Sequence, residues 1–203
     1  MQQRVPLGGG GVMVISLAML LFSGLILYPK VTNENILTAL QVTSVTTALP
    51  FLLVFAAKPL TLFSISRNLG QWAQMNRSSL WLILTISHFL HLYQIWLYYQ
   101  QGQSCSWYVW AITAPLWLIM ALFSGVELFN PQLFDRLSRA HGNRGLKLVH
   151  GIGSAYIWLV FTLAFGMGTL QHHLLFYNAP ALVLFLAGAL SWPMMWLLRR
   201  TIA

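Results

Sequence analysis

The sequence predicts an all-α integral membrane protein, built as a six-helix bundle with both termini in the cytoplasm. Composition is the first observation: 58% of the 203 residues are hydrophobic and only 7% are charged, whereas soluble domains have about 25% charged residues. Such a chain has too little polar surface to cover a globule in water. The second observation is a series of apolar stretches of about 20 residues, the length that a helix needs to cross a hydrocarbon core of about 30 Å. We therefore predict one transmembrane domain over residues 1–203, with spans at 12–28, 36–57, 79–99, 107–129, 146–170 and 174–198.

The segments around these spans carry weaker signals. No small-x-small cleavage site follows the first span, so we predict an uncleaved helix there rather than a signal peptide. Pro50 lies inside the second span and removes one backbone hydrogen bond, which predicts a kink. Residues 58–78 alternate polar and apolar side chains imperfectly, and we expect a short amphipathic helix on the membrane surface.

Positive charge divides cleanly between the two sides of this arrangement. Six spans place both termini on one side, together with ten of the 11 Lys and Arg residues, while only Lys30 falls on the other side. The positive-inside rule then assigns the termini to the cytoplasm. The net charge of +8 indicates topology and not nucleic-acid binding. We predict a multi-pass protein of the bacterial inner membrane whose partner is the lipid bilayer.

The third span holds the most informative residues, His88 and His91. They are three positions apart, so on a helix they share one face. An ionisable side chain at membrane depth is costly and marks a candidate functional site. His150 lies near the start of the fifth span, which runs in the same direction. At 1.5 Å per residue His88 lies about 15 Å deep, His91 about 20 Å and His150 about 6–9 Å.

These positions suit a heme iron held between the third and fifth spans, with His150 and either His88 or His91 as axial ligands. Depth favours His88. Gly153 and Ser154, at i+3 and i+4 from His150, would leave room for a ring plane. Arg77 and Arg144 lie at the membrane boundary, where propionates would emerge. The alternative is that the imidazoles only form hydrogen bonds between helices, because small residues and boundary arginines also occur without a cofactor. No Cys-x-x-Cys-His motif is present, so the heme would not be covalently attached.

Two stretches of the sequence carry a family resemblance. The first, RSSLWLILTISHFLH from Arg77 to His91, resembles the third-helix signature of the ferric-reductase-like transmembrane domains, although Leu80-Trp81 stands near the place of that family's Leu-Gly pair. The second, GLKLVHGIGSAYIWLVFTLAF from Gly145 to Phe165, is similar to the family's fifth helix, where a basic-x-Leu-His-x-x-x-Tyr-like pattern supplies the facing ligand. The heme-binding membrane subunit of the bacterial methionine-sulfoxide reductase system belongs to this superfamily. The resemblance covers residues 52–200.

The resemblance implies a b-type heme between the third and fifth helices, used for electron transfer as the heme-binding membrane component of an oxidoreductase. Leu163 stands where many members have a second histidine. We therefore expect one heme b, since a second would need His172 or His173 as its ligand. No dinucleotide-binding Gly-x-Gly-x-x-Gly motif opens a βαβ unit. Electrons would then come from a quinone or from a separate reductase or flavoprotein.

Two other functions remain open from the sequence. One is a non-redox scaffold or assembly subunit in which the histidines are structural. The other is a small transporter, although the prolines do not fall in matching positions of two halves, as inverted repeats would place them. Detection of bound heme in the purified protein would support the redox function over both of these alternatives.

Overall fold

The computed structural model describes residues 6–62, 66–104, 106–129, 144–171 and 175–202, apart from the side chains of residues 128, 144, 146–147, 175–177 and 198–202. Helices account for nearly all of these ranges, and they contain no β-strand. The predicted all-α class is therefore confirmed.

Six of the helices are long and apolar enough to cross a membrane. Their lengths of 19–28 residues correspond to about 28–42 Å at 1.5 Å per residue. Each predicted span is found, with ends that differ by a few residues. The six are α1 (Gly9–Leu27), α2 (Asn33–Leu60), α4 (Arg77–Gln100), α5 (Trp107–Phe129), α7 (Arg144–Leu170) and α8 (Leu175–Ile202).

A seventh helix, α3 (Arg67–Met75), confirms the short amphipathic helix predicted within residues 58–78. It buries Gly70 and Ala73 and exposes Arg67. Gly70 is required by a close approach, because a Cβ atom there would lie 2.7 Å from the backbone nitrogen of Thr61 at the end of α2. A larger residue would therefore push α3 away from α2.

Local hydrogen bonds mark where α2 and α4 begin. The Thr32 side chain accepts a hydrogen bond of 3.2 Å from the backbone N–H of Asn35, which caps the first turn of α2. Asn76 separates α3 from α4, and its side chain accepts a hydrogen bond from the backbone N–H of Leu7. Ser79 donates to the Leu7 carbonyl at 2.7 Å. The segment before α1 is thereby attached to the start of α4.

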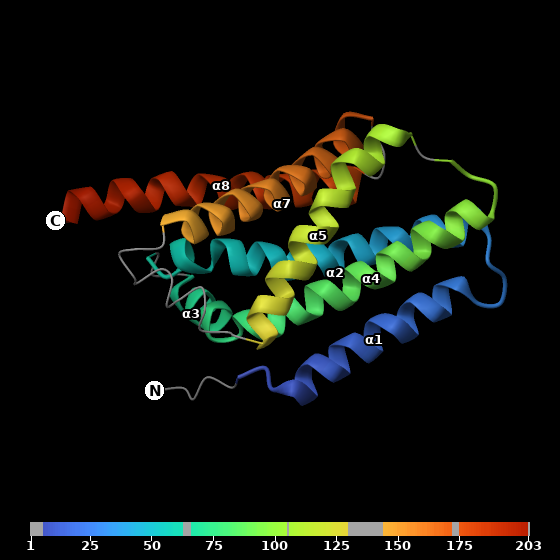
Figure 1. Ribbon diagram of the computed structural model, residues 1–203, viewed down its shortest axis with the longest axis horizontal. Helices are drawn as coiled ribbons and strands as arrows, with labels where there is room; N and C mark the ends of the chain where they lie inside the picture. The colour runs from blue at the N-terminus through green and yellow to red at the C-terminus, as the bar shows by residue number, and fades with distance from the viewer. Residues whose placement is uncertain (1–5, 63–65, 105, 130–143, 172–174, 203) are drawn as a thin grey trace.

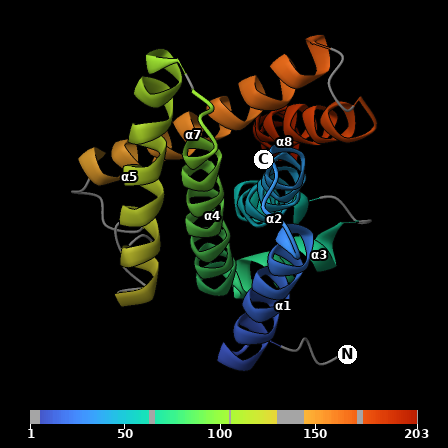
Figure 2. The ribbon, with the colours of Figure 1, turned by 90° about the vertical axis from the view of Figure 1, so that its right-hand side faces the viewer.

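Both chain termini lie at one end of the bundle, as an even number of spans requires (Figure 1). The helix α3 lies at this same end, while the connections α1–α2, α4–α5 and α7–α8 lie at the other. Figure 2, turned by 90°, shows α4 between α5 and α2, with α1 on one side of α2 and α8 on the other. Which end faces the cytoplasm remains a prediction.

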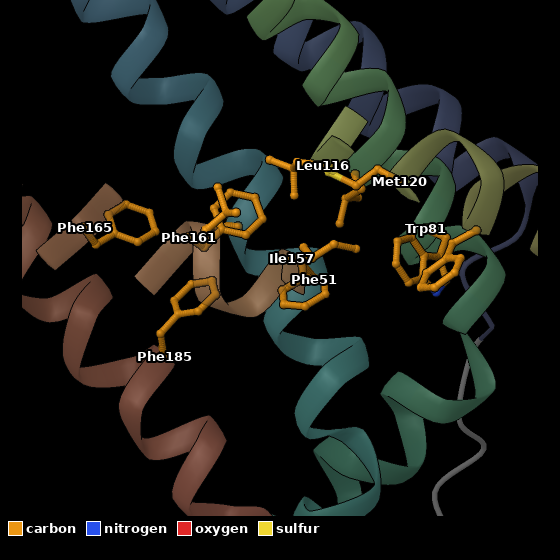
Figure 3. Close-up of a cluster of buried hydrophobic side chains, with 12 residues drawn as sticks. Phe51, Trp81, Leu116, Met120, Ile157, Phe161, Phe165 and Phe185 are labelled. Carbon is orange, nitrogen blue, oxygen red and sulfur yellow. The ribbon is translucent and has the colours of Figure 1, made fainter. Parts of the chain in front are cut away.

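The main core is aromatic and draws on five helices, as Figure 3 shows. Phe51 of α2 is its centre: its ring lies 5.8 Å from that of Phe161 and 6.3 Å from those of Trp81 and Phe185. Ring pairs at such spacings contribute about 0.5–1.5 kcal/mol beyond the area that they bury. This cluster fixes how α2, α4, α7 and α8 are rotated relative to one another.

Helix α1 stands apart from that core. It contacts both α2 and α4, and it packs on α4 through a small cluster in which Val12 and Met19 meet Ile83. The rest of its surface is apolar and exposed, including Leu21 and Leu25. A large exposed surface of leucine side chains is unfavourable in water and favourable in hydrocarbon. We therefore expect these side chains to contact lipid.

Candidate functional site

The helix α4 carries His88 and His91 near its middle, on the face that turns toward its neighbours. Their rings lie 6.0 Å apart and are nearly parallel, at 7°. His88 is buried, with 7% of its surface exposed. The shared face predicted from their spacing is therefore present, but the two side chains meet different helices.

His91 joins a neutral hydrogen-bond network with α2 and α1. Its Nδ1 lies 2.8 Å from the hydroxyl of Thr43, and Thr43 lies 2.7 Å from Oε1 of Gln94. Gln94 in turn donates to the hydroxyl of Ser23 at 3.2 Å. The Thr43 hydroxyl also lies 3.0 and 3.1 Å from two backbone carbonyls of its own helix, α2. We call His91, Thr43, Gln94 and Ser23 the neutral cluster.

His88 points instead at α5. Its ring lies on the indole of Trp117, with 3.5 Å between ring centroids and 20° between planes. Its Nε2 atom is buried and has no hydrogen-bond partner in the described part of the chain. An unpaired polar atom costs several kcal/mol in an apolar setting, so this nitrogen is the least satisfied atom of the three imidazoles.

A small hollow lies beside His88, between α4 and α5. It has room for about one water molecule. The residues around it are Thr85, His88, Phe89, Trp117, Met120 and Ala121.

His150 lies near the start of α7 and is also covered by α5. Its ring is stacked on that of Phe123, at 5.0 Å between centroids and 16° between planes. Its Nε2 lies 3.1 Å from Nη2 of Arg77, at the start of α4. A guanidinium only donates, so Nε2 accepts, and the ring carries its proton on Nδ1.

Arg77 has a second partner on α5. Its Nη2 lies 2.8 Å from Oε1 of Glu127. Glu127 is buried, with 2% of its side chain exposed, and its other oxygen lies 3.4 Å from the Ser78 hydroxyl. We call Arg77, Glu127 and His150 the charged cluster, and it links the ends of α4, α5 and α7.

The small residues after His150 were expected to leave room for a heme ring, but the structure shows no open space beside Gly153. A Cβ atom on Gly153 would lie 2.5 Å from Cζ of Phe123, so the space left by this glycine is filled by the Phe123 ring. Ser154 is half-buried. Arg144 is the first residue of α7, but its side chain lies outside the described residues, as do His172 and His173.

The donor chemistry of these residues suits a heme iron, while the space around them is closed. A bis-histidine heme needs two neutral imidazoles with available lone pairs, and Nε2 of His88 has no other partner among the described residues. The hollow lined in part by His88 is many times smaller than a porphyrin. Trp117 and Phe123 lie against His88 and His150, so a porphyrin would require both side chains to move. Among the described residues, no three His, Cys, Asp or Glu side chains group together as a site for a bare metal ion.

The sequence did not single out Glu127, Trp117 or Phe123 as site residues. Glu127 had a usable signal, because it is the only acidic residue within the six predicted spans. The two aromatic residues had none, since α5 contains many aromatic side chains at similar spacing.

These features define a six-helix integral membrane protein with three imidazoles inside the bundle and an ion pair between the partly exposed Arg77 and the buried Glu127 at its end. No family model, curated protein or solved structure matches the chain. The family resemblance therefore rests on the two helix sequences themselves.

Proposed function

We propose that this chain is a b-type heme protein of the bacterial inner membrane. It would transfer electrons from a quinol or flavoprotein donor to an acceptor, as a ferric-reductase-like membrane component of an oxidoreductase. The observation that carries the proposal is His88: a buried imidazole in the middle of a membrane helix with an unpaired nitrogen. Keeping such a group without a partner is costly, and an iron atom is a partner that would offset that cost.

His88 and His150 are the proposed axial ligands. His91 is the weaker candidate, because its Nδ1 is held by Thr43 within the neutral cluster. His88 lies on α4 and His150 on α7, and both rings lie against α5.

The other residues would orient and insulate the site. Arg77, beside His150, is the residue that we expect to pair with a propionate. The aromatic core around Phe51 excludes water from the bundle, and a low dielectric environment tunes the potential of a bound heme. When bound, the heme supplies the one-electron chemistry, and two histidine ligands leave no open position for oxygen.

A second function is favoured by the existing pairings. His91 and His150 already have hydrogen-bond partners, Thr43 and Arg77, without any cofactor. In a scaffold or assembly subunit these contacts would simply hold helices together.

An absorption spectrum of the purified protein separates the two. After expression with ample heme, we expect sharp α and β bands on reduction. His88→Ala and His150→Ala should abolish them, while His91→Ala, the matched control from the same helix face, should keep them. A colourless wild-type protein would end the redox proposal and leave the scaffold function.

A further inference from the structure

The end of α2 and the short helix α3 are joined by close contacts. A Cβ atom on Gly70 of α3 would lie 2.8 Å from the carbonyl oxygen of Ala57 and 2.7 Å from the backbone nitrogen of Thr61. The Ser66 hydroxyl, just before α3, donates to the Leu60 carbonyl at 3.0 Å. These contacts fix the last turn of α2 against the first turns of α3. We call residues 57–62 and 66–75 the α2–α3 corner.

Two cationic side chains belong to this corner. Lys58 lies in the turn of α2 that Gly70 touches, and Arg67 is the first residue of α3, three positions before Gly70. Both side chains are exposed. The described residues contain only two carboxylates, Glu34 at the other end of α2 and Glu127 in the charged cluster. Within the part of the chain that the structure describes, neither Lys58 nor Arg67 therefore has a carboxylate partner.

Large apolar side chains are exposed at the same corner. Leu69 and Met75 of α3 are about half exposed, and Leu62 is more than one-third exposed. Helix α2 is one of the six that can cross a membrane, and it ends at Leu60, so the corner lies at the boundary of the bilayer. Cationic and apolar side chains on one short helix suit this boundary, because the charges can stay among head groups while the apolar groups reach the acyl chains.

The charge on this side of the membrane favours an anionic ligand. The order of the spans places ten of the 11 Lys and Arg residues on this side, together with only two of the three acidic residues. A free phosphate could use only the positive charges of the corner. An anionic lipid could also use Leu69 and Met75, and it is present at high local concentration in a membrane.

We propose that the α2–α3 corner binds the phosphate head group of an anionic phospholipid from the surrounding leaflet. Lys58 and Arg67 contact the phosphate, and Leu69 and Met75 lie against the acyl chains. Each cation near an anionic membrane surface strengthens binding about fivefold, the equivalent of about 1 kcal/mol. This site is independent of the proposed redox function, because it contains none of the three histidines of the bundle.

The first test measures lipid preference by native mass spectrometry. The full-length protein is equilibrated with micelles that contain equal amounts of dioleoylphosphatidylglycerol and dioleoylphosphatidylcholine, which have the same acyl chains. We expect the wild type to retain mainly phosphatidylglycerol. Lys58→Gln/Arg67→Gln should lower this preference about 25-fold, the product of the two charges. Because both side chains are exposed, this variant should unfold at the wild-type temperature.

The matched control is Arg199→Gln/Arg200→Gln, which removes the same charge near the end of α8 instead of at the corner. It should lower the preference less than about fivefold, because no direct contact is lost. Equal retention of the two lipids by the wild type, or an equal reduction in both double variants, would overturn the proposal.

The second test separates a lipid from a soluble anion. Leu69→Gln keeps both charges and removes an acyl-chain contact, so it should lower the retention of both lipids and leave their ratio unchanged. An excess of glycerol 1-phosphate, which carries the charge without the acyl chains, should not displace phosphatidylglycerol. Displacement by glycerol 1-phosphate, or wild-type retention in Leu69→Gln, would show that the corner binds a soluble anion and would refute the lipid site.

Discussion

The neutral cluster around His91 and the charged cluster around His150 hold their imidazoles with different kinds of side chain. Both hold an imidazole inside a membrane bundle. The neutral cluster uses hydroxyl and amide groups of α1, α2 and α4, each with a partner at 2.7–3.2 Å. The charged cluster uses one arginine shared by a carboxylate and an imidazole, 2.8 and 3.1 Å away.

This difference predicts how strongly the stability of each cluster depends on one residue. A neutral group that loses its hydrogen-bond partner in a membrane can often bond to another group nearby, so the loss of one partner lowers the free energy of unfolding only slightly. The side chain of Arg77 is only 27% exposed, so water would solvate its charge incompletely if the counter-ion were lost. We therefore expect the charged cluster to be sensitive to single substitutions and the neutral cluster to tolerate them.

The largest expected effect is that of Glu127→Ala. It leaves Arg77 without its counter-ion and should lower the free energy of unfolding by about 3 kcal/mol. Chemical unfolding in detergent micelles measures this. Glu34→Ala, at the exposed start of α2, is the control and should cost no more than about 1 kcal/mol. Arg77→Leu/Glu127→Leu should recover most of the loss, because apolar side chains can replace a buried ion pair. Equal losses for Glu127→Ala and Glu34→Ala would contradict the contrast between the clusters.

A smaller effect is expected at Gly153, which lies against the ring that covers His150. Gly153→Ala forces its methyl group toward Cζ of Phe123 and should destabilise the protein by about 2 kcal/mol. Gly151→Ala is a matched control two positions earlier, because a Cβ there meets no atom within 4 Å. That substitution should be neutral or stabilise α7 by up to about 1 kcal/mol. If the two variants unfolded at the same denaturant concentration, the close contact between Gly153 and Phe123 would be contradicted.

The smallest effect is expected in the neutral cluster. Thr43→Val keeps the shape of the side chain and removes the hydroxyl between His91 and Gln94. We expect a loss of about 0.6 kcal/mol, and at most about 1.7, the range measured for hydrogen bonds between membrane helices. Thr38→Val on the exposed side of α2 is the control and should change stability by less than about 0.5 kcal/mol. A loss at Thr43 as large as that at Glu127 would show that the two clusters do not differ.

The helices were predictable because the signals for them are local. Each span is an apolar run whose length matches the bilayer. The α3 helix was predictable from the alternation around Leu69 and Trp72. Depth and spacing were enough to select His88, His91 and His150 as the candidate site, and to place His88 and His91 on one face.

The contacts of those histidines were not predictable. Thr43 lies 48 positions from His91, and Arg77 lies 73 positions from His150. Such pairings depend on how each helix is rotated and tilted, which no local pattern records. The same holds for Phe123, whose place over Gly153 follows from the inclination of α5.

The sequence by itself determined the class of this protein: six apolar helices that must lie in lipid, since a backbone in hydrocarbon has to form its own hydrogen bonds. It also determined that three imidazoles lie within the bundle. Only the tertiary structure decided that His91 belongs to a neutral network, that His150 is held by Arg77, and that His88 keeps an unpaired nitrogen. The reason is that the aromatic core around Phe51 sets the rotation of the helices, and this rotation assigns each side chain its neighbours.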